Sequence, residues 1–223
     1  MTTIDLENST VRELNRELHT ASAGSWYVKN PRGAHALAVG LNAPLYVEIV
    51  GHAGYYCAGM NQEATVIVKG NVATGVAENM MSGRVHVHGH ASQSAGATAH
   101  GGLLIIDGDA SARCGISMKG INIVVKGSVG HMSAFMGQAG DLVVLGDAGD
   151  ALGDSLYEAR LFVRGKVASL GTDCVEKEMR SEHLTALAEL LRQSGADADP
   201  SEFRRYGSSR KLYNFQRDNV SHY

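Results

Sequence analysis

Short segments in which aliphatic and other residues alternate recur every nineteen positions along the middle of the chain. Alternation of this kind predicts a β-strand with one buried face. A glycine follows each segment at once, so the chain is expected to turn there. The repeated aliphatic pairs are Val66 and Val68, Val85 and Val87, Leu104 and Ile106, Ile123 and Val125, Leu142 and Val144, and Leu161 and Val163.

Six full units run without a gap from Gly51 to Arg164, and a looser unit begins at Arg32. The third unit position is always Ala or Val, and the eighth is always Ala or Gly. A fixed period of this length predicts that each coil lies on the one before, about 4.8 Å away. We therefore expect an all-β fold, a single-stranded parallel β-helix of about seven coils, right-handed, whose small eighth residue marks a close approach of opposite walls.

The flanking segments have helical patterns. Thr10 and Glu13 form a capping box before a short helix, and residues 181–193 carry leucines on one face and end before Gly195. Because an open solenoid end exposes strand edges, we expect these helices to act as covers. The predicted organisation is an N-terminal helical cap segment (1–31), the β-helix (32–171), a C-terminal helix (172–195) and an interaction tail (196–223).

Composition agrees with a narrow core and excludes several classes of function. The chain has 223 residues, 27 glycines, 6% aromatic residues and a formal charge of −3, which argues against general nucleic-acid binding. The start MTTIDLENST does not read as a secretory signal and no apolar run is long enough for a membrane span, so we expect a cytoplasmic protein. The three cysteines form no CxxC pair, which disfavours disulfide, zinc and iron–sulfur sites.

The glycine pattern of the coils resembles a known family. Its clearest copy runs from Gly146 through Gly149 to Gly153 as G-x-x-G-x-x-x-G. This pattern, over about residues 32–171, is similar to the GXGXG domain, the C-terminal β-helix of the glutamate synthase large subunit. A similar domain occurs in the C subunit of formylmethanofuran dehydrogenase and in the related formyltransferase/hydrolase complex. Since no helix follows these glycines, a dinucleotide-binding fingerprint is disfavoured.

The terminal segments TIDLENSTVRELNREL and FRRYGSSRKLYNFQRDN most resemble the stand-alone GXGXG subunits of N-methylglutamate synthase and its relatives. The resemblance implies a non-catalytic structural subunit of a transferase that converts methylamine and glutamate to N-methylglutamate and ammonia. Such a subunit bridges an amidotransferase-like subunit and an FMN-binding subunit, and the FMN and the iron–sulfur cluster belong to a partner. No catalytic, cofactor-binding or metal-binding residue is implied on this chain. A β-helix subunit of a formyl-transfer complex remains the alternative.

One surface of the coils is a candidate subunit interface. The seventeenth unit position should face outward, yet it is mostly apolar, interrupted only by Glu48 and His86. Exposed apolar patches mark contact surfaces. Either a partner subunit or the chain's own terminal helices could cover this ribbon, and both predict that it is buried in the assembly. The candidate interface residues are Ile67, Ile105, Val124, Val143 and Phe162 on the ribbon, and Tyr206, Arg210, Tyr213 and Phe215 on the basic and aromatic tail.

Three further groups of residues have metal-ligating, redox or acid–base chemistry. His86, His88 and His90 are metal-ligand types, but no acid or cysteine stands beside them, so a solvated or interfacial face is favoured. Cys57 and Cys114 share a unit position three coils apart, about 14 Å, too far for a disulfide. A glycan-cleaving groove would need carboxylates on one face, whereas the acids of the coils are scattered over several positions: Asp107, Asp109, Asp141 and Asp147.

Overall fold

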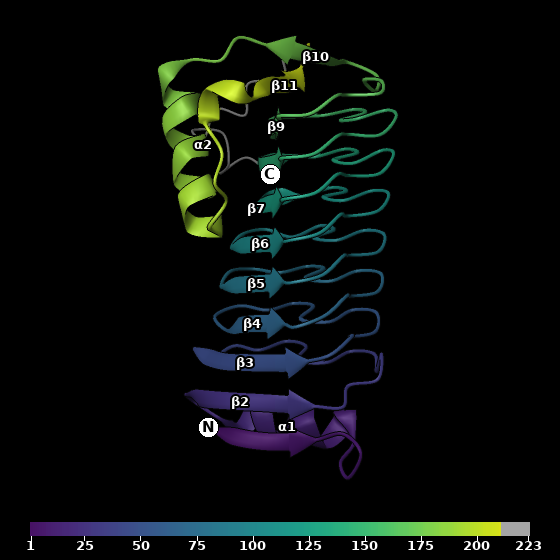
Figure 1. Ribbon diagram of the computed structural model, residues 1–223, viewed down its shortest axis with the longest axis vertical. Helices are drawn as coiled ribbons and strands as arrows, with labels where there is room; N and C mark the ends of the chain where they lie inside the picture. The colour runs from purple at the N-terminus through teal and green to yellow at the C-terminus, as the bar shows by residue number, and fades with distance from the viewer. Residues whose placement is uncertain (211–223) are drawn as a thin grey trace, which may run out of the picture.

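The computed structural model describes residues 1–210 and shows a column of stacked coils with one helix at each end (Figure 1). Eleven strands of the described chain form one sheet in the order β1-β2-β3-β4-β5-β6-β7-β8-β9-β11-β10. The coil strands are β3 (Leu45–Val50), β4 (Thr65–Val68), β5 (Arg84–Val87), β6 (Leu103–Ile106), β7 (Lys119–Val125), β8 (Ala139–Val144) and β9 (Arg160–Val163).

Residues nineteen apart lie directly beside one another in this sheet. Val66 pairs with Val85, Val85 with Leu104 and Leu104 with Ile123, all in parallel register. A second wall of each coil is joined by single parallel bridges at the third unit position, from Ala53 through every coil to Val167. The predicted single-stranded β-helix is therefore confirmed, while its right-handedness stays a prediction.

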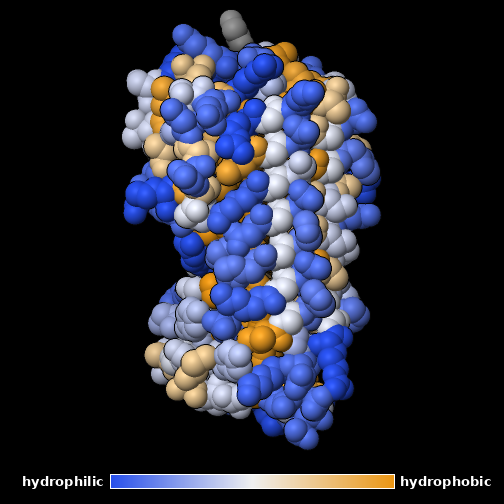
Figure 2. Space-filling model, viewed as in Figure 1, coloured by the Kyte–Doolittle hydropathy of each residue, from blue (hydrophilic) through white to orange (hydrophobic). Residues whose placement is uncertain are grey.

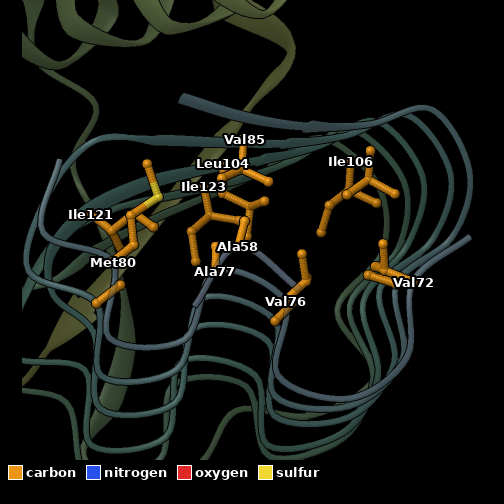
Figure 3. Close-up of a cluster of buried hydrophobic side chains, with 14 of the residues drawn as sticks. Ala58, Val72, Val76, Ala77, Met80, Val85, Leu104, Ile106, Ile121 and Ile123 are labelled. Atoms are coloured by element: carbon orange, nitrogen blue, oxygen red, sulfur yellow. The ribbon is translucent and has the colours of Figure 1, made fainter. Parts of the chain in front are cut away.

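The core is narrow and filled by the repeated aliphatic residues, which are fully buried. Val85, Leu104 and Ile123 point across the coil toward the small residues Ala58 and Ala77 on the facing wall (Figure 3). Each fully buried aliphatic side chain stabilises the fold by about 1.5–3 kcal/mol.

The eighth unit position is small for two physical reasons. Its backbone is left-handed, with φ of 54° at Ala58 and 67° at Gly96, a conformation in which bulky residues are strained. It also faces the strand wall, because a Cβ added to Gly96 would lie 2.7 Å from Cδ1 of Ile123. The expected close approach of opposite walls is confirmed.

The sheet begins earlier than the repeat predicts. Strands β1 (Thr2–Asp5) and β2 (Gly24–Lys29) extend it within the segment expected to be only a helical cap. Thr2 pairs with Trp26 and Gly24 with Leu45, so the partners are 24 and 21 residues apart, which hides these strands from a nineteen-residue period. Helix α1 (Val11–Thr20) begins at the predicted capping box and closes the core with two buried leucines, Leu14 and Leu18.

The C-terminal segments close the other end and then return along the column. They are β10 (Cys174–Lys177), α2 (Ser181–Ser194), the 3-10 helix η1 (Pro200–Glu202) and β11 (Arg204–Ser208). Strand β11 lies between β9 and β10, antiparallel to both. Helix α2 ends at Gly195, which has a φ of 65° as expected for a helix-ending glycine, and runs beside the last coils (Figure 1). Among residues 1–210, no helix has the length and apolar character needed to cross a bilayer.

Candidate functional site

The apolar ribbon on the outside of the sheet is covered by the chain itself. Ile105, Val124, Val143 and Phe162 are fully buried. They form a second hydrophobic core with Leu103 and Leu145 of the coils and with residues of the C-terminal segments: Leu187, Leu190 and Leu191 of α2, and Phe203. The structure therefore favours the internal cover over a subunit interface for these four ribbon residues, because a partner could reach them only if α2 moved away.

The other predicted interface residues are distributed differently. Ile67 lies on a coil before those that α2 covers and is 8% exposed, and Tyr206 is buried within β11. Arg210 is exposed and forms an ion pair with Asp173. Tyr213 and Phe215 lie outside the described residues. Partner contact through Ile67 and Arg210 stays a prediction, whereas Tyr206 contributes to the sheet that closes the column.

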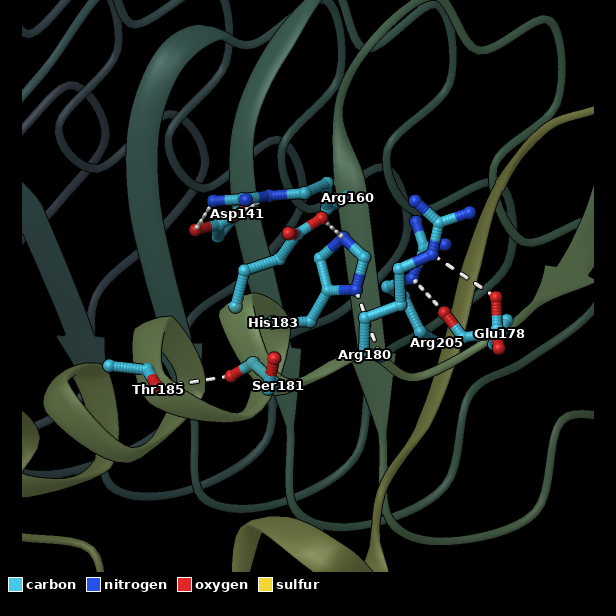
Figure 4. Close-up of polar contacts among 9 residues, drawn as sticks. Asp141, Arg160, Glu178, Arg180, Ser181, His183, Thr185 and Arg205 are labelled. Carbon is cyan, nitrogen blue, oxygen red and sulfur yellow. Dashed lines mark hydrogen bonds and ion pairs between the residues drawn. The ribbon is translucent and has the colours of Figure 1, made fainter.

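A polar cluster lies at the first turn of α2 (Figure 4). Arg160 donates two hydrogen bonds to the buried carboxylate of Asp141, at 2.6 and 2.7 Å. His183 lies beside this pair and accepts a hydrogen bond from the backbone N–H of Arg180 through Nδ1 at 3.2 Å. Burial, aided by the charge of Arg205, lowers the pKa of His183 and so favours its neutral form.

The last turn of α2 has its own attachment to an earlier coil. Arg84 of β5 donates a hydrogen bond from Nη2 to the backbone carbonyl of Gln193 at 3.0 Å. Helix α2 is thus held by this hydrogen bond at its last turn and by leucines along its length. The sequence left a partner subunit and the chain's own helices as alternative covers of the ribbon, and α2 covers it at Ile105, Val124, Val143 and Phe162.

Side chains at the second unit position form a hydrogen-bonded ladder along the column. Each one accepts a hydrogen bond from the backbone N–H of the same position in the next coil. The accepting atoms and their donors are His52 Nδ1 from Asn71, Asn71 Oδ1 from His90, His90 Nδ1 from Asp109, Asp109 Oδ1 from Ser128, Ser128 Oγ from Asp147, and Asp147 Oδ1 from Lys166, at 2.7–3.0 Å. On the surface, columns of hydrophilic and near-neutral residues follow the stack (Figure 2).

This ladder changes the interpretation of three residues. His90 belongs to it and not to a cluster with His86 and His88, and Asp109 and Asp147 are also ladder members. The sequence signal was available, since every member from residue 52 to 147 is a short side chain that can accept a hydrogen bond at one unit position. Sequence reasoning missed it because the residue types differ from coil to coil.

His86 and His88 converge on the carboxylate of Asp107. Nε2 of His86 lies 3.0 Å from Oδ1, and Nδ1 of His88 lies 2.9 Å from Oδ2. Lys126 lies 2.8 Å from Oδ1, and Nζ of Lys69 lies 3.0 Å from Nε2 of His88. The expectation that no acid stands beside the histidines was wrong, because coil stacking places Asp107 next to His88 although nineteen residues separate them.

The electrostatics of this cluster favour a neutral imidazole at His86 beside an ionised carboxylate at Asp107. Burial, aided by the charges of His88 and Lys126, lowers the pKa of His86, although the hydrogen bond and charge of Asp107 raise it. Burial opposes ionisation of Asp107, but hydrogen bonds from Lys126 and His86 outweigh that effect and lower its pKa. Neutral imidazole and ionised carboxylate are the forms that ligate metals. The ligand atoms of His86, His88 and Asp107 all lie within 4.8 Å of one another.

The three cysteines are free and buried. Burial raises the pKa of the Cys57 and Cys114 thiols to about 12, and burial raises that of Cys174 to about 11. Because the thiolate is the reactive form, these residues are inert at neutral pH. Cys57 and Cys114 are fully buried residues of the core.

Comparison with known proteins gives one strong match. The chain is 68% identical over 228 residues to Protein GlxC of Rhizobium meliloti (strain 1021), and the alignment covers 100% of both chains. No family model matches the sequence, and no solved structure matches it. The similarity to the Rhizobium protein therefore includes the terminal segments as well as the coils.

Proposed function

The chain belongs to the family of Protein GlxC, and from this premise we propose that it is a structural subunit of a multi-subunit, glutamate-synthase-like flavoenzyme. The observation that carries the proposal is the ungapped stack of nineteen-residue coils, which has the form of the β-helix that the glycine pattern resembles. Full-length similarity to one relative supports the same role for the terminal segments, which resemble those of N-methylglutamate synthase.

In the finer form of this proposal, the enzyme is a cytoplasmic N-methylglutamate synthase. The β-helix bridges an amidotransferase-like subunit and an FMN-binding subunit, which also holds the iron–sulfur cluster. A subunit that bridges two partners must be rigid enough to hold them in a fixed arrangement. The column meets this need because backbone hydrogen bonds join every coil to the next and the core between the walls is filled.

The chemistry of the carboxylates supports a scaffold over an autonomous glycan-cleaving enzyme. Asp109 and Asp147 accept backbone hydrogen bonds in the ladder, and Asp141 is paired with Arg160 beneath α2. Asp107 is engaged by two imidazoles and Lys126. These acids therefore have structural partners and do not face each other across a groove as a catalytic pair would.

Purification of the tagged chain from its native host tests the proposal. We expect it to bring down an FMN protein and an amidotransferase-like protein, with flavin absorbance and bound iron, and the complex should form N-methylglutamate from methylamine and glutamate. The bait for comparison is the same chain with α2 deleted, because loss of the helix exposes the ribbon and should alter recovery of partners. Recovery of a lone monomer would contradict the proposal.

The alternative is a subunit of a formyl-transfer complex. The resemblance of the coils to the β-helix of formylmethanofuran dehydrogenase favours it equally, while the terminal segments favour the flavoenzyme. Cofactor content separates the two: a metal-dependent amidohydrolase partner with no flavin would establish the alternative, and FMN with iron would exclude it.

A further inference from the structure

We propose that His86, His88 and Asp107 form a binding site for Zn²⁺ on the outer face of the column. This site is separate from the proposed scaffold role and does not depend on it. The three side chains supply two imidazole nitrogens and one carboxylate oxygen, a ligand set that zinc accepts in sites with an open fourth position. The ligand atoms are within 4.8 Å of one another on neighbouring coils.

The distances are close to those of a formed site. In a tetrahedral zinc site with bonds of about 2.0–2.1 Å, neighbouring ligand atoms lie roughly 3.3 Å apart. Here His86 Nε2 and His88 Nδ1 lie 3.0 and 2.9 Å from the two oxygens of Asp107. These distances go to different oxygens of Asp107, but one ligand atom from each residue lies within 4.8 Å of the other two, so small side-chain rotations would bring the three to the spacing of a zinc site.

The backbone holds these side chains in place. His86 lies on β5 and His88 directly follows the end of this strand; the two residues project to the same face, and their ring centroids are 4.1 Å apart. Asp107 directly follows β6, where its N–H donates to the carbonyl of Val87 at 2.9 Å. The strand register thus places His86 on β5 and the other two ligands directly after the ends of neighbouring strands, which is more precise than a long loop.

Two lysines affect the zinc affinity of the site in opposite ways. Lys126 contacts Oδ1 of Asp107, so Oδ2 can ligate the ion while Lys126 remains a hydrogen-bond donor to the other oxygen. Lys69 contacts Nε2 of His88, which must carry a proton once Nδ1 binds a metal. The ammonium of Lys69 then faces an N–H group and a dication, so it weakens binding and must swing into solvent.

This arrangement makes a prediction that a chance histidine pair would not share. Replacing Lys69 by Gln removes the opposing charge and supplies an oxygen that can accept a hydrogen bond from Nε2 of His88. We expect Lys69→Gln to tighten zinc binding by about tenfold, the effect of removing one charge near a dication in a mostly aqueous setting. A Lys126→Gln change removes charge but also the donor to Asp107, and should have a smaller effect.

The test is titration of the purified full chain with ZnCl₂ by calorimetry, with Co²⁺ absorption as a second probe of tetrahedral geometry. We expect saturable binding of a single equivalent. His88→Ala and Asp107→Asn should weaken it by more than the roughly 10–100-fold that loss of an outer partner costs. The matched control is His90→Asn, which removes the neighbouring imidazole but keeps the ladder acceptor, and should leave zinc binding unchanged.

Three outcomes would overturn the site. They are absence of zinc binding, binding that survives His88→Ala and Asp107→Asn, and binding that weakens in Lys69→Gln. Circular dichroism of each variant shows whether the coils remain folded. Since Lys69 is a surface side chain, Lys69→Gln keeps the proposal testable even if a ligand variant fails to fold.

Discussion

Arg160 donates two hydrogen bonds to the carboxylate of Asp141 on the neighbouring coil, beneath the first turn of α2. Asp141 is 4% exposed, so it depends on this partner. Asp141→Asn should lower the free energy of unfolding by about 1–3 kcal/mol, because it leaves Arg160 without its charged acceptor. Denaturant unfolding measures the loss. The comparison variant is Glu189→Gln on the exposed face of α2, where little change is expected.

A double-mutant cycle measures the interaction energy between Asp141 and Arg160 apart from the contacts that each residue makes with its surroundings. If Asp141 and Arg160 act as a unit, Asp141→Leu combined with Arg160→Met should be less destabilised than the sum of the two single changes. Additive losses would contradict a specific pairing.

The apolar ribbon beneath α2 predicts that the helix can be detached from the coils while the coils stay folded. Phe162 is fully buried between the coil and the C-terminal segments. Phe162→Ala should cost about 3–5 kcal/mol, the range for emptying a buried aromatic position. Hydrogen exchange should show the largest increase in α2. Ile67→Ala, on the same column of side chains but before the region that α2 covers, is the control and should leave exchange in α2 unchanged.

The ladder at the second unit position predicts which substitutions it accepts. Asn71 accepts a hydrogen bond from the backbone of His90 at 2.9 Å. Asn71→Asp keeps an acceptor and should be tolerated, whereas Asn71→Ala should cost about 0.5–1.5 kcal/mol through loss of one hydrogen bond. Thermal unfolding distinguishes them. Equal melting temperatures for the two variants would show that the ladder does not stabilise the column.

Acid should weaken the attachment of α2 through His183. Burial and Arg205 lower its pKa below the ordinary 6.5, with Arg160 and Arg180 acting in the same direction and Glu182 opposing them. The folded chain therefore binds this proton less readily than the unfolded chain does. The contribution of neutral His183 to stability is complete above pH 6.5, and it is lost as the pH falls below 6.5 toward the lowered pKa of His183 in the folded chain.

The measurement is the difference in unfolding free energy between the native chain and His183→Gln across this range, which removes the common effect of the carboxylates. This difference in unfolding free energy between the two chains should change as the pH falls. A constant difference would mean that His183 does not titrate with folding.

Much of the fold could be predicted from the sequence because one local pattern repeats without gaps. The strand register of Val66, Val85 and Leu104 and the small eighth residue both follow from the period. Strands β1 and β2 could not, since their partners are not nineteen residues apart. The capping box and the glycine after α2 are local signals, so both helices were predictable.

The candidate site was only half predictable. His86 and His88 stand out in the sequence, but Asp107 joins them through stacking, and the shared unit position of His88 and Asp107 was the available signal. The cover of the apolar ribbon was left open because sequence periodicity shows which face of α2 is apolar but not where the helix docks. Tertiary contact decided between a partner and the chain itself.

Repeated coils can in principle be gained or lost one at a time, yet α2 removes that freedom. Its leucines pack on side chains of the coils from Leu103 on β6 to Phe162 on β9, and its last turn is bonded to Arg84 on β5. A helix of 14 residues is about 21 Å long, and the four coil steps between those strands span about 19 Å. The length of the helix thus matches the height of the coils it covers. Duplication of a coil between β5 and β9 would therefore break either the packing on Phe162 or the hydrogen bond from Arg84.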